Sequence, residues 1–311
     1  MPNKLKYAIV LALGTALISG TNTFLTKTAV TAVSDPVVFT FLKNTVVALI
    51  LIGLIALTSR RHELKNLSRR DITKLLAIGA IGGSLPFILF FTGLTLVPAV
   101  TAGFIHKTLF IWVALLAVPF LKERIGNLQL AALALLLGGN LASFGLPKLT
   151  LGTGELMILA ATILWAMENI IAKKALAGLS SPLVASARMA IGSLIILVII
   201  VTQGKTALLF NLSTFQWIWT LITSLLLTGY VLTWYTALKA APATLVASLL
   251  VPATLVTNIL TAIFVTHTFP TTQLISGTFL ALGVTFIISR ANKISPAHGR
   301  RRPLLSLFPR S

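Results

Sequence analysis

The sequence predicts an all-α integral membrane protein with ten transmembrane helices in two inverted five-helix repeats. Its 311 residues are 56% hydrophobic and 10% charged, with a mean hydropathy of +0.97, whereas soluble domains carry about 25% charged residues. Ten apolar segments are long enough to cross a bilayer, and two stretches in opposite halves of the chain follow one pattern. These three observations together favour a membrane transporter built from an internal duplication.

The ten spans follow from length, since a bilayer core of about 30 Å needs about 20 apolar residues in a helix. We expect them at residues 7–31, 36–58, 72–94, 98–120, 127–145, 153–173, 182–202, 215–238, 242–265 and 271–290. The connectors at Pro98, Pro182, Pro242 and Pro270 are very short, which predicts antiparallel hairpins. Proline fits these positions, because it is tolerated in the first turn of a helix. The first segment is too long and too polar at its far end for a cleaved signal peptide, so we interpret it as a permanent span.

The distribution of Lys and Arg predicts the orientation. Nineteen of the 25 lie in the N-terminus, the connectors after spans 2, 4, 6 and 8, and the tail, whereas Lys27, Lys148 and Lys205 lie on the opposite side. The positive-inside rule then places both termini in the cytoplasm of a multi-pass protein, which we expect in the inner (plasma) membrane. The net charge of +19 is thereby explained by topology, with no nucleic-acid partner.

Five spans per repeat make the second copy enter the membrane from the other face. We therefore expect inverted repeats at residues 7–145 and 153–290, followed by a basic cytoplasmic tail at 291–311. The repeated pattern is a Ser-x-Pro turn and an apolar run with one basic residue, SDPVVFTFLK at 34–43 and SSPLVASAR at 180–188. Inverted repeats place the substrate site near mid-membrane, where the two halves meet.

This layout, together with the Leu121-Lys122-Glu123-Arg124 end of span 4, resembles the drug/metabolite transporter superfamily, and within it the EamA-type proteins. The resemblance covers residues 7–290 and implies an exporter of amino acids, metabolites or drugs. Two features depart from the family pattern. The second repeat has His267 where the family usually has a glutamate, and span 4 has His106-Lys107-Thr108 where a proline is common.

Three basic residues, Lys43, Lys107 and Arg188, lie well inside apolar spans, accompanied by one acidic residue, Glu168. Each costs about 2.5–3.5 kcal/mol at a helix centre, so such residues face a cavity or a partner. Glu168 and Arg188 lie at similar depth on adjacent spans, where a structural ion pair is one interpretation. Asn22 is the counterpart of Glu168 in the first repeat, which leaves Lys43 without a full counter-charge.

The excess positive charge favours an anionic or zwitterionic solute. The candidate substrate-binding residues are Asn22, Lys43, His106, Lys107, Trp165, Glu168, Asn169 and Arg188. Structural roles are the alternatives. Lys107 then bonds to backbone carbonyls, and His106 and Trp165 only pack between helices. A histidine that titrates near neutral pH also makes His106 a possible carrier for proton coupling.

Absent motifs narrow the function further. The chain has no cysteine, no phosphate-binding loop, no HExxH and no nucleophile elbow, so we expect no enzyme, metal or cofactor. We predict a secondary active transporter, most simply an exporter, that moves a small polar metabolite, amino acid or organic anion by alternating access. Ten spans can enclose a cavity in a monomer. The alternative is a flippase for a lipid-linked or amphipathic anionic substrate.

Overall fold

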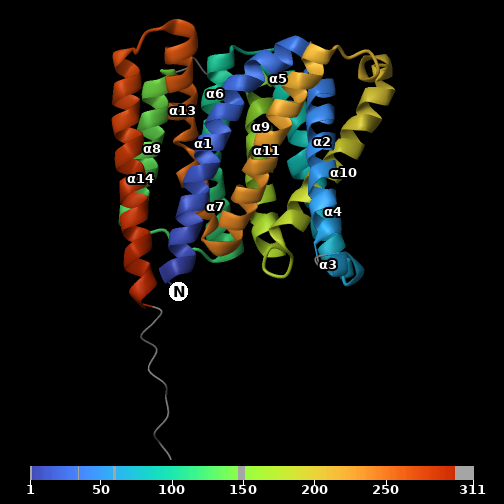
Figure 1. The fold of residues 1–311 in the computed structure, drawn as a ribbon. Coiled ribbons are helices and arrows are strands. Elements are labelled where there is room, and N and C mark those ends of the chain that lie inside the picture. The colour runs from blue at the N-terminus through green and yellow to red at the C-terminus, as the bar shows by residue number, and fades with distance from the viewer. Residues whose placement is uncertain (1, 34, 59–60, 146–150, 298–311) are drawn as a thin grey trace, which may run out of the picture.

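The computed structural model describes residues 2–33, 35–58, 61–145 and 151–297, and every regular element in these ranges is a helix (Figure 1). Ten candidate membrane spans are long and apolar enough to cross a bilayer, which confirms the predicted fold class. Each overlaps one predicted span, with ends that differ by a few residues. The predicted tail begins within the last helix, whereas residues 298–311 and Lys148 lie outside the described residues.

The first five spans use seven helices. They are α1 (Pro2–Val33), α2 (Pro36–Leu57), α4 (Arg69–Gly83) with α5 (Leu85–Leu94), α6 (Ala99–Lys107) with α7 (Leu109–Leu121), and α8 (Asn127–Phe144). The connector between the second and third spans forms one short helix, α3 (Arg61–Lys65).

The other five spans repeat this order. They are α9 (Thr153–Ala175), α10 (Ser181–Thr202), α11 (Thr214–Ala240), α12 (Ala243–Leu250) with α13 (Ala253–Thr261) and a π turn at Ala262–Thr266, and α14 (Thr271–Ala297). A single 3-10 turn, Thr206–Leu209, lies in the connector before α11. The N-terminus and the end of α14 lie on the same side of the bundle (Figure 1). We call it the basic side, because most Lys and Arg residues lie there.

Three spans that the sequence predicted as continuous are interrupted. The third breaks at Ser84, the fourth at Thr108, and the ninth at Val251 and Pro252. Proline explains two of the breaks: Pro86 and Pro252 have no amide to donate to the carbonyl four residues earlier. The carbonyl of Gly82 is thereby left to accept from other helices, whereas the carbonyl of Ser248 accepts from the Val251 amide at 3.3 Å.

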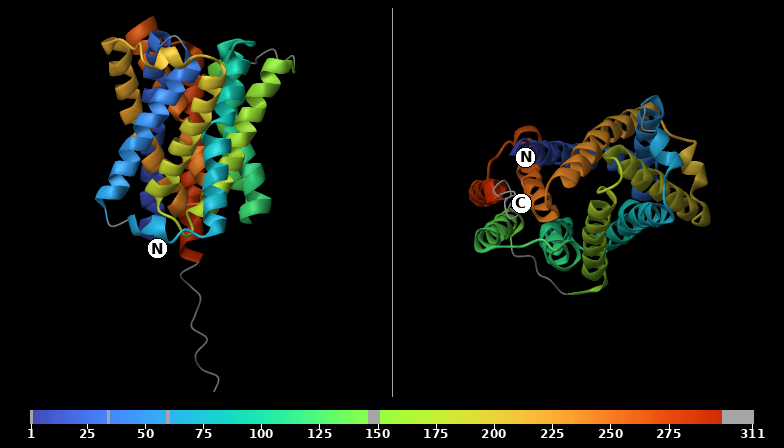
Figure 2. Two further views of the ribbon diagram at one scale, coloured as in Figure 1. Left: turned by 90° about the vertical axis from the view of Figure 1, so that its right-hand side faces the viewer. Right: turned by 90° about the horizontal axis from the view of Figure 1, so that it is seen from below.

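The helix pairing has the two-fold symmetry that inverted repeats require. Helix α1 packs on α11 as α9 packs on α5, and α10 packs on α4 as α2 packs on α11. The pairs α2–α10 and α8–α14 join corresponding spans of the two repeats. Seen from below, α8 and α14 form one end of an elongated bundle and α2, α4 and α10 the other (Figure 2). Each of these interfaces joins a helix of one repeat to a helix of the other, so the two halves interlock.

A glycine pair sets the distance between α4 and α10. A Cβ atom added to Gly192 would lie 2.6 Å from the carbonyl oxygen and 2.7 Å from the Cα of Gly83. Real side-chain atoms do not approach a backbone this closely, so the crossing requires glycine. The close crossing brings α10 against the break in the third span.

The buried core is continuous on the basic side and divided on the opposite side. One cluster of buried apolar residues includes members from all ten spans, and these members lie in the halves nearest the basic side. Toward the opposite side there are two separate clusters, one from α1, α2 and α10, the other from α6 and α9. The bundle is therefore packed as one unit at the basic side and as two units at the other.

Asp35 begins α2 and links it to the second repeat. Its Oδ1 accepts from the amides of Val37 and Val38 at 2.9 and 3.0 Å, and its Oδ2 lies 2.8 Å from Lys205 Nζ. Partial burial acts to raise the pKa of this carboxyl, but the hydrogen bond and charge of Lys205, with the two amides, hold that pKa below its usual value. The ionised form is thus favoured in the folded protein.

We expect Asp35→Ala to lower the free energy of unfolding by about 1 kcal/mol at pH 7, the usual cost of a lost helix cap. Because the folded pKa is depressed, the stabilising effect of the charge is fully present above the unfolded pKa of about 3.9 and is lost as pH falls through the folded pKa. Thermal unfolding of the detergent-solubilised protein at stepped pH measures this. Asp35→Asn keeps a capping oxygen, and its deficit should vanish at low pH; a deficit independent of pH would contradict the assignment.

Candidate functional site

The candidate site forms at the break in the third span. Pro86 cannot donate to the carbonyl of Gly82, so that oxygen accepts from two side chains of the second repeat instead. Trp165 Nε1 on α9 and Arg188 Nη2 on α10 each donate to it at 3.1 Å. Both side chains are buried, at 7% and 8% exposure. One proline of the first repeat thus positions two predicted site residues of the second.

Glu168 and Arg188 border Gly82 without forming a direct ion pair. A Cβ atom on Gly82 would lie 3.1 Å from Glu168 Cδ and 3.2 Å from Arg188 Nε. The Glu168 carboxylate, 1% exposed, instead accepts from the Tyr235 hydroxyl at 2.5 Å. The described residues show no nitrogen-to-oxygen distance within 4.0 Å between the two charged groups, and Arg188 Nε has no hydrogen-bond partner. Both groups therefore keep unused bonding capacity.

Tyr235 is a residue that sequence reasoning left out of the site. It is fully buried on α11 and donates to the only acidic side chain of the site. In the sequence it lies close to Tyr230 and Trp234, within the eighth predicted span. The hydrogen bond to Glu168 was not evident, because it depends on how α11 packs against α9.

Asn169 connects the same two helices. Its Nδ2 donates to the carbonyl of Trp165 at 2.9 Å, and its Oδ1 accepts from Trp234 Nε1 at 3.0 Å. The side chain is 4% exposed. These bonds hold Trp234 against α9. Asn169, a predicted site residue, therefore makes a contact that joins α9 to α11.

His106 reaches this group from α6 through aromatic contacts. Its ring lies 4.9 Å from that of Trp165 and 5.4 Å from that of Phe90, in both cases edge to face. Phe87 completes the cluster at 5.2 Å from Trp165. The histidine Nδ1 is buried and has no hydrogen-bond partner. His106 is therefore packed, as the structural alternative expected, but retains one unused polar atom.

Lys43 and Lys107 are the lysines that lie well inside the spans of the first repeat, and among the described residues neither has an acidic partner. Lys43 is 9% exposed and its Nζ lies 5.0 Å from the centre of the Phe39 ring, a cation–π contact. Lys107 is half-buried, and only its backbone carbonyl is bonded, by Asn140 Nδ2 at 3.2 Å. Within the described ranges neither ammonium has a hydrogen bond or an ion pair.

The predicted site residues do not all meet. Asn44, next to Lys43, lies 3.5 Å from the carbonyl of Gly83, so α2 reaches the break in the third span. Asn22 is half-buried, with an Oδ1 that has no partner, and no hydrogen bond to Lys43 is found among the described residues. Trp165, Glu168 and Arg188 border the break, and His106 packs on Trp165. Among the described residues, no hydrogen bond or ion pair joins Asn22 or the Lys107 side chain to this group.

On the basic side of the bundle, the carboxylate of Glu123 joins the fourth span to the ninth. Glu123, at the end of the fourth span, accepts from the amides of Ala243 and Thr244 at 2.6 and 3.1 Å and from the Thr244 hydroxyl at 2.7 Å. These are the first residues of α12, so the carboxylate caps this helix and meets the positive end of its dipole. We refer to this contact as the Glu123 cap.

Among the residues that the structure describes, the opposite side shows no equivalent of the Glu123 cap. Lys122 and His267 end the fourth spans of the two repeats, and both have left-handed backbones, with φ of 56° and 53°. The residue after His267 is Thr268, which is exposed. The position that corresponds to Glu123 is therefore a threonine without a carboxylate.

The described residues contain no group of three or more His, Cys, Asp or Glu side chains that is able to hold a metal ion. The charged groups that border the break are instead the Glu168 carboxylate and the Arg188 guanidinium, from two helices of the second repeat.

Comparisons with known proteins are consistent with this architecture. The model of the EamA-like transporter family matches twice, at residues 6–144 and 152–290. Among solved structures, one titled "Crystal structure of protein" superposes with a TM-score of 0.73 at 15% identity, covering 92% of this chain and 98% of that one. At this identity the likeness concerns the fold alone. No curated protein matches the sequence.

Proposed function

Because the chain belongs to the EamA-like transporter family, and is thus a membrane transporter of the drug/metabolite type, we propose that it is a secondary active exporter of a small anionic or zwitterionic solute. An amino acid or an organic anion fits best. The observation that carries the proposal is the pair of lysines: the ammonium groups of Lys43 and Lys107 have no acidic partner in the described ranges. A bound carboxylate or phosphate supplies the missing charge.

Alternating access is supported by the unequal packing of the two sides. A continuous core at the basic side and a divided core at the other is the arrangement of a transporter closed on one side and loosened on the other. With the basic side in the cytoplasm of the plasma membrane, this is an outward-facing state. Proton coupling through His106 belongs to the same proposal, because its Nδ1 has no partner beside the site.

The test is transport by protein reconstituted in liposomes, with and without a proton gradient. We expect Lys43→Ala and Lys107→Ala each to lower transport of the anionic solute at least about tenfold, which corresponds to about 1.4 kcal/mol. Lys74→Ala is the matched control, because this lysine is paired with Asp71 at 3.3 Å and lies away from the break. The proposal is wrong if both variants, expressed normally, leave transport of every anionic candidate unchanged.

The flippase alternative has one observation in its favour. The cavities that open on the lateral faces are apolar, and one of them is lined by Ser186 and Ala187, immediately before Arg188 on α10. A lipid-linked substrate would enter from that side. In the same liposomes, movement of a labelled anionic lipid between leaflets, with no solute transported, would favour the flippase over the exporter.

A further inference from the structure

An apolar groove lies between α2, α4 and α10, the helices that form one end of the bundle (Figure 2). Its volume is about 490 Å³, within the range of cavities that hold small ligands. The lining is apolar and comes from both repeats; it includes Ile55, Leu75, Leu76, Leu183, Ala190 and Ile191. Leu76 is 52% exposed, so this wall faces the hydrocarbon of the bilayer.

One polar atom in the groove has no partner. The Ser186 side chain lines the cavity, is 5% exposed, and its hydroxyl makes no hydrogen bond. Buried hydroxyls are normally bonded. Ser186 lies five residues into α10, about 8 Å from the basic end of that helix at 1.5 Å per residue. At this depth the carbonyl of an acyl ester is an available acceptor.

Three cations lie at the basic rim of the groove, and the acidic residues near them are hydrogen-bonded to other groups. Lys65, Arg69 and Arg70 are exposed and follow or precede the lining residues Leu64, Leu67 and Ile72 in the chain.

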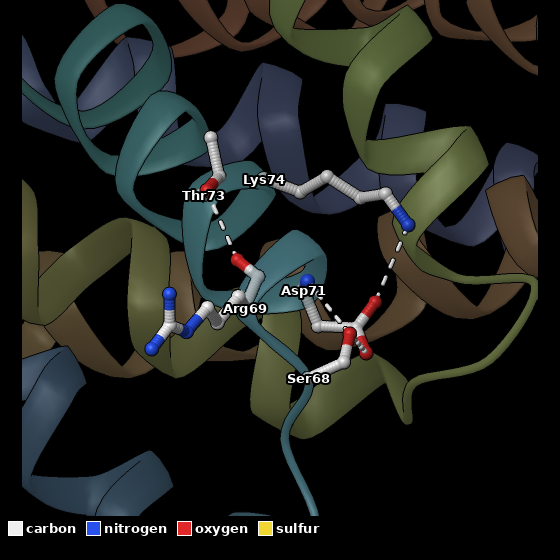
Figure 3. A network of polar contacts seen from close by, with 5 residues as sticks. All are labelled: Ser68, Arg69, Asp71, Thr73 and Lys74. Carbon is white, nitrogen blue, oxygen red and sulfur yellow. Dashed lines mark hydrogen bonds and ion pairs between the residues drawn. The ribbon is translucent and has the colours of Figure 1, made fainter.

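Both acids of this rim have other partners. Glu63 accepts from the amide of Ser180 at 3.1 Å. Asp71 accepts from Ser68 at 2.6 Å and pairs with Lys74, while the Arg69 guanidinium points away from that pair (Figure 3). The free charge at the rim is therefore positive.

We propose that this groove binds an anionic membrane phospholipid, with one acyl chain between α4 and α10. The phosphate contacts Arg69, Arg70 and Lys65 at the rim, and Ser186 donates to an ester carbonyl. An apolar slot beneath a basic rim matches this amphipathic anion. Because α4 and α10 belong to different repeats, the lipid bridges the halves on the closed side.

The test uses the full-length protein, purified in detergent and stripped of lipid. Phosphatidylglycerol or phosphatidylcholine with identical acyl chains is added back, and bound lipid is counted by native mass spectrometry. We expect phosphatidylglycerol to bind at least about fivefold more tightly than phosphatidylcholine. Ala190→Phe, which fills the groove, and the double variant Arg69→Gln with Arg70→Gln should each lower this binding by a similar factor.

Two controls are matched to these variants. Leu156→Phe fills a smaller apolar cavity on another face, and Arg124→Gln removes an exposed charge from another basic connector; both should bind lipid like the original protein. The rim variants alter exposed side chains only, so lipid binding can still be measured with them if Ala190→Phe fails to fold. The proposal is overturned if the two lipids bind equally, or if the rim variants bind phosphatidylglycerol as well as the original protein does. It is also overturned if free inorganic phosphate competes for the site as well as phosphatidylglycerol does.

Discussion

Replacing Arg188 by alanine is expected to abolish transport and to lower the free energy of unfolding by about 3–5 kcal/mol, the cost of removing one member of a buried charged pair. Arg188 is 8% exposed and donates to the Gly82 carbonyl, which no backbone amide satisfies. Its removal leaves Glu168 with Tyr235 as its hydrogen-bond partner but without a nearby cation. Thermal unfolding and liposome transport measure the two effects separately.

A double variant separates the structural from the functional contribution. Arg188→Met together with Glu168→Gln removes both charges and keeps similar side-chain volumes, so it should recover most of the lost stability. Transport should remain absent, because the guanidinium at the break is gone although Lys43 and Lys107 remain. If the double variant transported normally, Arg188 would be a structural residue with no part in the site.

Replacing Glu123 by alanine is expected to open the basic side. The substitution removes three hydrogen bonds to the start of α12, of which charge-assisted bonds contribute about 1.5–3 kcal/mol each. If about 2 kcal/mol of this acts on the balance between closed and open states, the open population rises about thirtyfold. A cysteine at position 247, where Ala247 is 4% exposed, should then react faster with a membrane-impermeant maleimide added from the basic side.

The absence of cysteine from the chain makes this measurement direct, because no native thiol competes for the label. Glu123→Gln keeps two acceptor lone pairs but no charge, so its labelling rate should lie between those of the original protein and Glu123→Ala. A cysteine replacing Thr23, which is exposed toward the opposite side, serves as the reference. Unchanged labelling at position 247 in both variants would show that the Glu123 cap does not hold this side closed.

The spans could be predicted from sequence because their cause is local: length and hydropathy are properties of each segment. The break at Thr108 could not, because it lies within a long apolar run. The breaks at Ser84 and at Val251 could have been indicated by Pro86 and Pro252, which were visible in the sequence. What no local pattern shows is which side chains bond to the Gly82 carbonyl.

The charges of the candidate site were found from sequence for a similar reason. A lysine or arginine inside an apolar run stands out wherever the helix packs. Their partners were harder to predict: Glu168 bonds to Tyr235 instead of pairing directly with Arg188, and Glu123 caps α12. Both contacts join residues more than 60 positions apart, so they depend on how the helices pack and not on any spacing in the chain.

The Glu123 cap also bears on the affinity measured from each side of the membrane. Under the alternating access that we propose, a carboxylate at one end of the molecule and Thr268 at the corresponding position of the other make the two end states of the cycle differ in energy in the absence of ligand. In that proposal a solute that arrives from the basic side meets a form that is rarely populated, and its apparent dissociation constant is the intrinsic one divided by that small fraction. The same site then binds weakly from one side and tightly from the other, and Glu123 raises the concentration at which transport saturates on the basic side.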